Sequence, residues 1–168
     1  MQMNQIQPIA PLDEAAVHPD QYGAICWRMH RSKVEVLLIT SRDTGRWVIP
    51  KGWPMDNRSA SEAAQQEAWE EAGVRGDIAE TAIGMFNYVK LLTSKRSSEC
   101  VVKVFALRVS KLVDKFPERK ERRRKWFAAE KAARMVIEPE LRQLLLGLSA
   151  NLLAELPELG AEQALATT

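Results

Sequence analysis

Apolar and alternating runs near the start of the chain predict a β-hairpin. Residues 22–30 (YGAICWRMH) alternate in the manner of a β-strand, and residues 34–41 (VEVLLITS) are rich in β-branched and aliphatic side chains. The turn-like stretch 31–33 lies between them. A third short extended segment, residues 46–50 (RWVIP), ends at a proline, which has no N–H to donate to a β-ladder.

Residues 60–72 are predicted to form a helix, because helix-favouring residues, several of them alanine, fill the run. Ser59 and Glu62 have the Ser-x-x-Glu spacing of a capping box, in which both side chains accept from free main-chain N–H groups of the first turn. Gly73 is the residue type that commonly ends a helix in the left-handed conformation. The helix is therefore expected between Ser59 and Gly73.

More extended segments are predicted after this helix. Residues 76–92 look extended, residues 93–99 (TSKRSSE) form a polar loop, and residues 100–109 (CVVKVFALRV) have the composition of a strong strand. A basic loop follows, and residues 125–127 (KWF) are again extended. The two aromatic residues of this last segment are expected in the core rather than stacked on a nucleobase.

Two helices are predicted near the C-terminus, at about residues 129–136 and 139–156. Leucines recur at helical spacing in the second: Leu141, Leu144, Leu145, Leu148 and Leu152. Strands on both sides of a central helix, followed by two helices, predict an α+β fold in which a mixed β-sheet is sandwiched between α-helices.

The length of 168 residues suits one domain with a packed core. We expect that domain to span residues 21–157, after an irregular N-terminal lead-in (residues 1–20) that contains several prolines. Residues 158–168 are expected to form a flexible C-terminal tail of mostly small residues. With 46% hydrophobic and 27% charged residues, the composition indicates an ordinary globular protein rather than a disordered or fibrous one.

The formal net charge is only +2, but residues 111–125 carry eight basic and three acidic side chains. Such a run fits a nucleic-acid patch, a platform for a polyanionic small molecule, or a solvated surface. Nucleic-acid binding is the least favoured of the three, and it would be recognised by a steep dependence on salt concentration.

Cys26 and Cys100 lie in apolar, strand-like runs, and we expect both to be buried, reduced thiols without a disulfide. The first twenty residues contain no basic segment followed by an apolar one. No apolar run is long enough to span a bilayer. We therefore expect a cytoplasmic protein that does not enter membranes.

Glu67, Glu70 and Glu71 are spaced i, i+3 and i+4, which places three carboxylates on one face of the predicted helix. The opposite side carries alanines: Ala64, Ala68 and Ala72. Alanines allow a helix to approach a sheet closely, so the acidic face is expected to turn outward toward a cleft. A Glu71→Gln change on such an open face would leave the melting temperature nearly unchanged.

A solvated acidic face is physically tolerable, because like charges at this spacing cost a helix only about 0.2–0.5 kcal/mol per pair. Two details nevertheless favour a bound cation. Glu70 and Glu71 lie near the C-terminal end, where the helix dipole disfavours anions, and no lysine or arginine follows four residues later within the helix. Carboxylate oxygens suit Mg²⁺ or Mn²⁺, whereas His18 and His30 lack the spacing of a zinc site.

The stretch GWPMDNRSASEAAQQEAWEEAGV, residues 52–74, resembles a Nudix box. The matching positions are Gly52, Glu67, Ala68, Glu70, Glu71, Gly73 and Val74. Two positions depart from the family pattern, because Arg58 stands where the family has glutamate and Gln66 where it has arginine. These departures remove one acid and one base together, and all three glutamates of the acidic face remain.

The flanking segments, residues 40–53 and 121–136, are similar to the diphosphoinositol polyphosphate and diadenosine polyphosphate hydrolase branch of the Nudix family. The resemblance implies the Nudix fold and hydrolysis of a diphosphate linked to another group. It implies that Glu67 and Glu71 hold Mg²⁺ or Mn²⁺ with help from a main-chain carbonyl near Gly52. Glu70 would bind a further metal or accept the proton of the attacking water, and Glu99 is a possible extra ligand or base.

Substrate binding is assigned, by match to that branch, to five basic residues: Arg28, Arg42, Lys51, Lys95 and Arg96. Arginine suits phosphate because its planar guanidinium donates two parallel hydrogen bonds. Residues 122–124, all arginine, would extend this platform for a highly phosphorylated substrate. Against that, Glu138 stands where the inositol-type enzymes tend to carry a basic residue.

Three functional hypotheses follow. The first is a metal-dependent Nudix pyrophosphohydrolase acting on a small polyphosphate of the diphosphoinositol polyphosphate type. The second is a dinucleoside polyphosphate hydrolase. The third is a Nudix-fold ligand-binding or regulatory module without catalysis, for which the departures at Arg58 and Gln66 are the support. The oligomeric state is left open.

Overall fold

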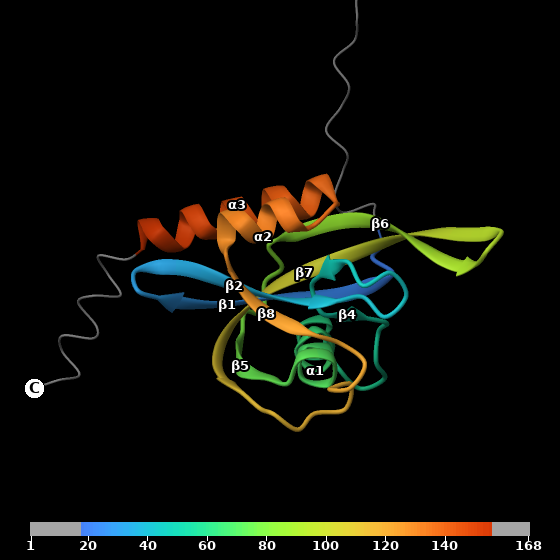
Figure 1. Cartoon of the computed structure of the whole chain (residues 1–168), viewed down its shortest axis with the longest axis horizontal. Coiled ribbons are helices and arrows are strands. Elements are labelled where there is room, and N and C mark those ends of the chain that lie inside the picture. The colour runs from blue at the N-terminus through green and yellow to red at the C-terminus, as the bar shows by residue number, and fades with distance from the viewer. Residues whose placement is uncertain (1–17, 156–168) are drawn as a thin grey trace, which may run out of the picture.

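The computed structural model describes residues 18–155 and places one mixed sheet between two helical layers (Figure 1). Helix α1 (Ala60–Ala72) covers one face, and α2 (Ala129–Met135) and α3 (Pro139–Ala154) cover the other. The predicted α+β sandwich is therefore confirmed. Residues 1–17 of the expected lead-in and the whole expected tail, 158–168, lie outside the described residues.

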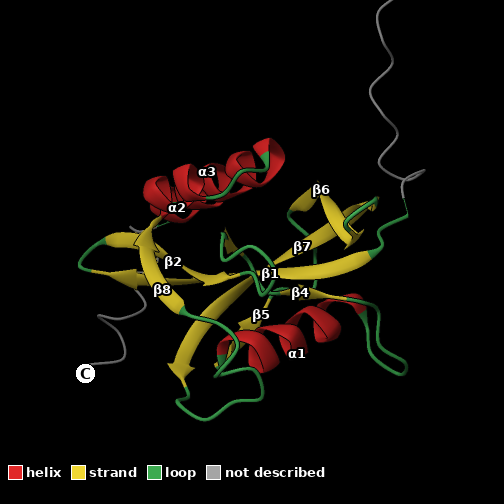
Figure 2. Cartoon of the chain, turned by 45° about the vertical axis from the view of Figure 1, so that its right-hand side comes forward, coloured by secondary structure: helices red, strands yellow, loops and turns green. Residues whose placement is uncertain are grey.

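The sheet has eight strands. They are β1 (Gln21–His30), β2 (Lys33–Thr40), β3 (Trp47–Val48), β4 (Lys51–Gly52), β5 (Val74–Ile78), β6 (Gly84–Thr93), β7 (Arg96–Leu112) and β8 (Arg124–Ala128). The central order is β3-β2-β1-β7-β5, with β4 on β1, β6 on β7 and β8 on β2 (Figure 2). The β1–β7 pair is parallel and the other pairs are antiparallel, so the sheet is mixed.

Strands β1 and β2 form the predicted hairpin, with Cys26 opposite Leu37. Its two-residue turn, Arg31-Ser32, has positive φ values of 49° and 63°. Two successive residues with positive φ are typical of the tight turns whose twist matches that of paired strands. The turn therefore fixes the register of the hairpin.

Helix α1 forms as its local sequence predicts. The Ser59 hydroxyl accepts from the Glu62 N–H, and the Glu62 carboxylate accepts from the Ser59 N–H, which completes the capping box. Gly73 has φ of 65° and ends the helix in the left-handed conformation. A β-carbon at this position would also collide with Phe116 and with the carbonyl of Val113, so no larger residue fits.

Two hydrophobic cores lie on the two faces of the sheet. One is closed by α2 and α3 and includes Ile25, Leu38 and Leu145. The other is closed by α1, whose alanines (Ala64, Ala68 and Ala72) are fully buried against strands β1, β2 and β7. The thiols of Cys26 and Cys100 are both buried and free, as expected.

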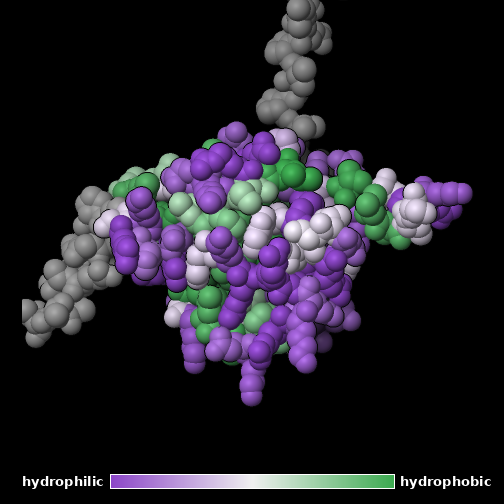
Figure 3. Space-filling model, viewed as in Figure 1, coloured by the Kyte–Doolittle hydropathy of each residue, from purple (hydrophilic) through white to green (hydrophobic). Residues whose placement is uncertain are grey.

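The structure corrects the polar loop predicted at residues 93–99. Strands β6 and β7 continue through most of this segment, so that Ser98 pairs with Lys90 and Glu99 with Val89. Main-chain pairing with a neighbouring strand has overridden the polar composition. The resulting β6–β7 arm projects from the body of the domain (Figure 1) and carries exposed hydrophobic side chains, among them Val89, Leu91 and Leu92 (Figure 3).

Candidate active site

A pocket of about 460 Å³ lies where several distant segments of the chain meet. This volume is in the range of about 300–1,000 Å³ typical of small-molecule sites. Six segments line it: β1 through Gln21, residues 41–48, residues 51–55, α1 through Glu67 and Glu71, β6 through residues 88–91, and the β7–β8 loop (residues 113–123) through Glu118 and Arg122. The pocket therefore joins the acidic helix to five other segments.

The structure brings Glu67, Glu71 and Gly52 together at this pocket. A β-carbon on Gly52 would overlap the Glu67 carboxylate, so β4 and α1 are in direct contact there. The Glu71 Oε2 atom accepts from the main-chain N–H of Lys51 at 3.3 Å. Glu70 does not line the pocket, and its carboxylate accepts from the Gln66 side-chain amide at 3.2 Å.

The acidic face is less open than expected, which is a correction to the sequence interpretation. Glu71 is only 7% exposed. A protein cation also pairs with it, because Arg122 Nη2 lies 3.3 Å from Glu71 Oε1. The helix itself contains no such partner, as the sequence indicated, but the β7–β8 loop supplies one from 51 residues away.

The carboxylates of this cluster hold their protons unusually strongly. Burial raises the pKa of Glu67 to about 7, and the negative charges of Glu70 and Glu118 contribute. Burial also raises the pKa of Glu71 to about 7, although Arg122 and Lys51 act in the opposite direction. The pKa of Glu118 is raised, again mainly by burial. Loss of hydration, more than repulsion between the carboxylates, therefore disfavours their ionised forms in this part of the pocket.

Lys51 is the second cation beside these carboxylates. Burial lowers its pKa, while the charge of Glu71 raises it. Its Nζ lies 4.7 Å from the ring centroid of Tyr88 on β6, within cation–π distance. The lysine is thus enclosed between the acidic helix and the β6–β7 arm.

The donor set fits a hard divalent cation. Within residues 18–155 there is no group of three or more His, Cys, Asp or Glu side chains placed to hold a metal ion. The two carboxylates of Glu67 and Glu71, however, lie beside the main chain of β4 in an open pocket, and burial and repulsion oppose their negative charge. Mg²⁺ commonly takes one or two carboxylates and completes its shell with water and substrate phosphate.

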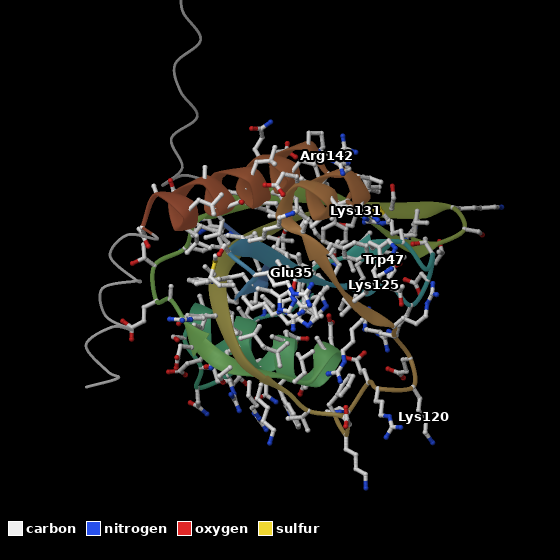
Figure 4. The ribbon with its side chains drawn as sticks, turned by 60° about the vertical axis from the view of Figure 1, so that its left-hand side comes forward. Glu35, Trp47, Lys120, Lys125, Lys131 and Arg142 are labelled. Atoms are coloured by element: carbon white, nitrogen blue, oxygen red, sulfur yellow. The ribbon has the colours of Figure 1, made fainter. Side chains whose placement is uncertain are left out.

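The predicted substrate-binding residues are divided by the structure. Arg42 and Lys51 line the pocket. Arg28 instead forms an ion pair with Glu35 at 2.8 Å, and its guanidinium lies 4.0 Å from the Trp126 ring centroid. Figure 4 shows Glu35 on the sheet, within β2.

Lys95 and Arg96 lie at the tip of the β6–β7 arm, outside the pocket lining. Glu99 is exposed in β7 and is likewise outside the lining. The roles assigned from the sequence to Arg28, Lys95, Arg96 and Glu99 stay predictions. Phe127 is buried in the core, as expected, and Trp126 is partly buried against the core under α1.

The basic run of residues 111–125 is not a uniform surface. Arg122 turns inward to the pocket, and Arg124 Nη1 donates to the carbonyls of Ala72 and Val113, at 2.7 and 2.9 Å. Lys120, in contrast, points away from the body of the domain (Figure 4). Two of the arginines thus bind groups inside the domain. The local excess of positive charge at the surface is therefore smaller than the sequence suggests.

Sequence reasoning missed three pocket residues: Glu118, Trp53 and Arg46. It also did not predict that Arg46 pairs with Glu138. Glu118 was hidden because it lies within the basic run. Glu138 is buried and forms an ion pair with pocket-lining Arg46 at 2.7 Å, which explains an acid at this position. Trp53 is 51% exposed at the pocket, which is unusual for a tryptophan.

Comparison with known proteins places this geometry in context. Residues 19–147 match the family model of the NUDIX domain. The chain is 36% identical over 105 residues to Nudix hydrolase 12, mitochondrial, of Arabidopsis thaliana, covering 60% of this chain and 51% of that protein. It is 28% identical over 116 residues to diphosphoinositol polyphosphate phosphohydrolase 3-alpha of Mus musculus, covering 68% and 66%.

The matched region spans about half the length of the first Arabidopsis relatives. Among solved structures, C. elegans Ap4A hydrolase aligns with a TM-score of 0.57 and 21% identity, covering 81% of this chain and 99% of that one. The E. coli dihydroneopterin triphosphate pyrophosphohydrolase aligns with a TM-score of 0.60 and 16% identity, covering 78% and 94%. These structures share the fold. Within residues 18–155, no helix combines the length and the apolar character needed to cross a membrane.

Proposed function

The chain belongs to the Nudix domain family, and on this premise we propose that it is a metal-dependent pyrophosphohydrolase acting on a polyphosphorylated small molecule. The observation that carries the proposal is the position of two carboxylates with raised pKa values, half-buried Glu67 and buried Glu71, in one pocket with the cations Lys51, Arg42 and Arg122. Carboxylates attract a divalent cation, and the neighbouring cations attract phosphate. A diphosphate needs both kinds of group.

In this proposal Glu67 and Glu71 hold Mg²⁺ or Mn²⁺, assisted by the main chain at Gly52. The bound cation would neutralise diphosphate charge and stabilise the departing phosphate. Arg42, Lys51 and Arg122 bind and orient the phosphates from the other walls of the pocket.

Two residues are candidates for the proton acceptor. Glu70 was assigned this role, or that of a further metal ligand, from the family resemblance, and Gln66 holds its carboxylate. Glu118 lines the pocket and has a raised pKa, which suits a group that must accept a proton near neutral pH. Separate Glu70→Gln and Glu118→Gln variants distinguish the two by which one removes the acidic limb of the pH–rate profile, where the rate rises as the base loses its proton.

The first candidate substrate is a diphosphoinositol polyphosphate. The support is the sequence similarity to the Mus musculus relative of that name and the basic groups of the pocket. The second candidate is a dinucleoside polyphosphate. One observation favours it: exposed Trp53, together with Met55 and Leu91, makes part of the pocket wall apolar, and a flat aromatic surface suits a nucleobase.

A direct test is to incubate the purified full chain with a panel of diphosphates, including diphosphoinositol pentakisphosphate and diadenosine tetraphosphate, with Mg²⁺ or Mn²⁺. Products are separated by ion-exchange chromatography, and Glu71→Gln serves as the inactive control. We expect metal-dependent cleavage of at least one of these two substrates. If neither metal supports cleavage of any compound, the protein is instead a ligand-binding or regulatory module, and calorimetry with the same panel would measure that binding.

A further inference from the structure

The β7–β8 loop is docked on the C-terminal end of α1. The loop contacts are Val113 N–H to Gly73 O at 2.8 Å and Glu118 N–H to Glu70 O at 2.9 Å, and Arg124 at the start of β8 adds a contact from Nη1 to Ala72 O at 2.7 Å. Carbonyls at the end of a helix lack partners within the helix, so the loop satisfies groups that α1 leaves free. The loop is therefore held in a fixed position against the turn that carries Glu71.

This loop places the guanidinium of Arg122 between two carboxylates. Its Nη2 donates to Glu71 Oε1 at 3.3 Å and to Glu118 Oε1 at 3.4 Å, and its Nη1 donates to the Thr40 carbonyl at 3.2 Å. The side chain is only 10% exposed, and Nε is buried without a partner within residues 18–155. Arg122 is thus committed to the acidic cluster on one side and to β2 on the other.

The two oxygens of Glu71 differ in how firmly they are held. Oε2 accepts from the main-chain N–H of Lys51, which β4 fixes in place. Oε1 accepts from the end of the Arg122 side chain at the same distance, 3.3 Å, but a side chain can change rotamer where a paired strand cannot move. A metal ion that binds Glu71 at Oε1 therefore has to displace the Arg122 guanidinium, whereas the donor at Oε2 is the fixed main-chain N–H of Lys51.

The sequence of α1 explains why a distant arginine is needed. The Nudix pattern has an arginine at position 66, but this chain has Gln66, whose neutral amide donates to Glu70. The acidic face consequently has no cation within its own helix. The charge that the helix lacks comes from the β7–β8 loop.

We propose that Arg122 is the counter-cation of the acidic face in the metal-free protein and that it leaves Glu71 when a divalent cation binds there. The proposal rests on the metal site described under the proposed function. A divalent ion interacts with a carboxylate about twice as strongly as a guanidinium at equal distance. Once displaced, Arg122 stays anchored to the Thr40 carbonyl beside the pocket, where its free Nη2 can donate to a substrate phosphate.

The first test measures Mn²⁺ binding to the full-length, metal-stripped chain by electron paramagnetic resonance of free Mn²⁺. Arg122→Gln should bind Mn²⁺ about three- to tenfold more tightly than wild type, because a competing charge has been removed. Arg119→Gln is the matched control, since Arg119 lies exposed in the same loop and should leave the Mn²⁺ Kd unchanged. Equal or weaker binding by Arg122→Gln would overturn the proposal and would make Arg122 a group that orients Glu71 for the metal.

Thermal unfolding of the same variants adds a second readout. Without metal, Arg122→Gln should melt below wild type, because a buried carboxylate has lost its partner. Saturating Mn²⁺ should raise its Tm by more than it raises that of wild type. An equal rise in both proteins would contradict the exchange of one cation for the other.

A third measurement needs no variant and so does not depend on whether Arg122→Gln folds. The Nε–Hε signal of Arg122 in ¹⁵N-labelled wild type should shift during titration with Mg²⁺ and saturate together with metal binding. A signal that stays unmoved at saturating Mg²⁺, or a wild type that binds neither ion, refutes the proposal. None of these readouts requires hydrolysis, so tighter Mn²⁺ binding by Arg122→Gln without cleavage of any diphosphate would sustain this proposal and refute the proposed activity alone.

Discussion

The carboxylate of Glu67 lies directly against the main chain of Gly52, at the place where a β-carbon on residue 52 would stand. Gly52 belongs to β4, which pairs with Tyr22 on β1, so its position is fixed by the sheet. Glu67 comes from α1, which lines the same pocket. This contact sets how closely the acidic helix approaches β4 and therefore where the proposed cation can lie.

Gly52→Ala is expected to disable the site without unfolding the protein. The added methyl group would push away the flexible end of Glu67, because a side-chain carboxylate yields more easily than a paired strand. Mn²⁺ affinity and diphosphate hydrolysis should each fall by about 10- to 100-fold, the usual effect of disturbing the surroundings of a metal ligand. Calorimetric titration measures the Mn²⁺ affinity, initial-rate assays measure hydrolysis, and a thermal melt checks that the variant remains folded.

Gly147→Ala is the matched control. Gly147 is in α3, and no atom lies within 4 Å of a β-carbon built there. Alanine in a helix is better than glycine by about 0.5–1 kcal/mol, so this variant should be slightly more stable than wild type and should bind Mn²⁺ normally. A Gly52→Ala variant with wild-type Mn²⁺ affinity would show that Glu67 does not hold the metal.

Glu71→Gln should lower hydrolysis by about 10²-fold or more, because the charge of a proposed metal ligand is lost. Its effect on stability differs from the sequence-based expectation of no change. Burial raises the pKa of Glu71 to about 7, so the ionised carboxylate is disfavoured in the folded state at pH 8. A neutral amide should therefore raise the Tm of the metal-free protein at pH 8, and differential scanning calorimetry measures that rise.

The matched variant is Glu62→Gln, at the exposed capping box of the same helix, which should keep its activity. A metal-free Tm of Glu71→Gln well below that of wild type at pH 8 would contradict the account of an under-compensated carboxylate. It would mean that the ion pair with Arg122 stabilises the fold more than burial opposes it.

Helix α1 was predictable from sequence because its limits depend on neighbours in the chain. The capping box of Ser59 and Glu62 and the left-handed Gly73 are local features, and the structure confirms all three. The carboxylate spacing was equally local. The residue that covers the acidic face could not be predicted from the sequence. Arg122 comes from 51 residues away, and nothing in the basic run distinguishes it from the exposed residues around it.

The β6–β7 arm, in contrast to α1, could not be predicted fully from the sequence. Polar residues such as Ser98 gave no sign of a strand, because their place in β7 depends on pairing with Lys90 across the hairpin. The same register decides which side chains of β6 face the pocket. For this reason the sequence predicted the acidic helix but not the pocket wall that includes Tyr88 and Leu91.

Trp53→Ala should separate the two candidate substrates. Loss of ring stacking costs about 0.5–1.5 kcal/mol, which corresponds to a two- to tenfold rise in KM for diadenosine tetraphosphate. The KM for a diphosphoinositol polyphosphate should change little, because its ring bears phosphates instead of a flat apolar surface. Initial-rate kinetics with both compounds measures the difference.

Leu146→Ala controls for the loss of an exposed hydrophobic side chain, since Leu146 is 42% exposed on α3 and outside the pocket lining. It should leave both KM values unchanged. If Trp53→Ala affects the two substrates equally, the apolar wall does not recognise a base, and the argument for dinucleoside polyphosphates loses its support.

The stability of the metal-free protein should fall as pH rises from 5 to 8. The pKa values of Glu67 and Glu71 are raised from 4.5 to about 7 in the folded state. Between these values the folded protein binds more protons than the unfolded chain, so the free energy of unfolding decreases with pH. The contribution is complete below pH 4.5, where both states are protonated, and is lost as the pH rises through 7.

Thermal melts in EDTA at several pH values from 5 to 8 measure this slope. Lys51 has a lowered pKa, which gives the opposite sign toward alkaline pH, so the scan ends at pH 8. The Glu67→Gln/Glu71→Gln double variant should flatten the slope, because neither residue then titrates. Saturating Mg²⁺ should raise the wild-type Tm more at pH 8 than at pH 5, since ionised carboxylates bind the cation and protonated ones do not. A metal-free Tm that is constant or rises across this range would contradict the raised pKa values and, with them, the view that the acidic cluster is short of positive charge until a metal arrives.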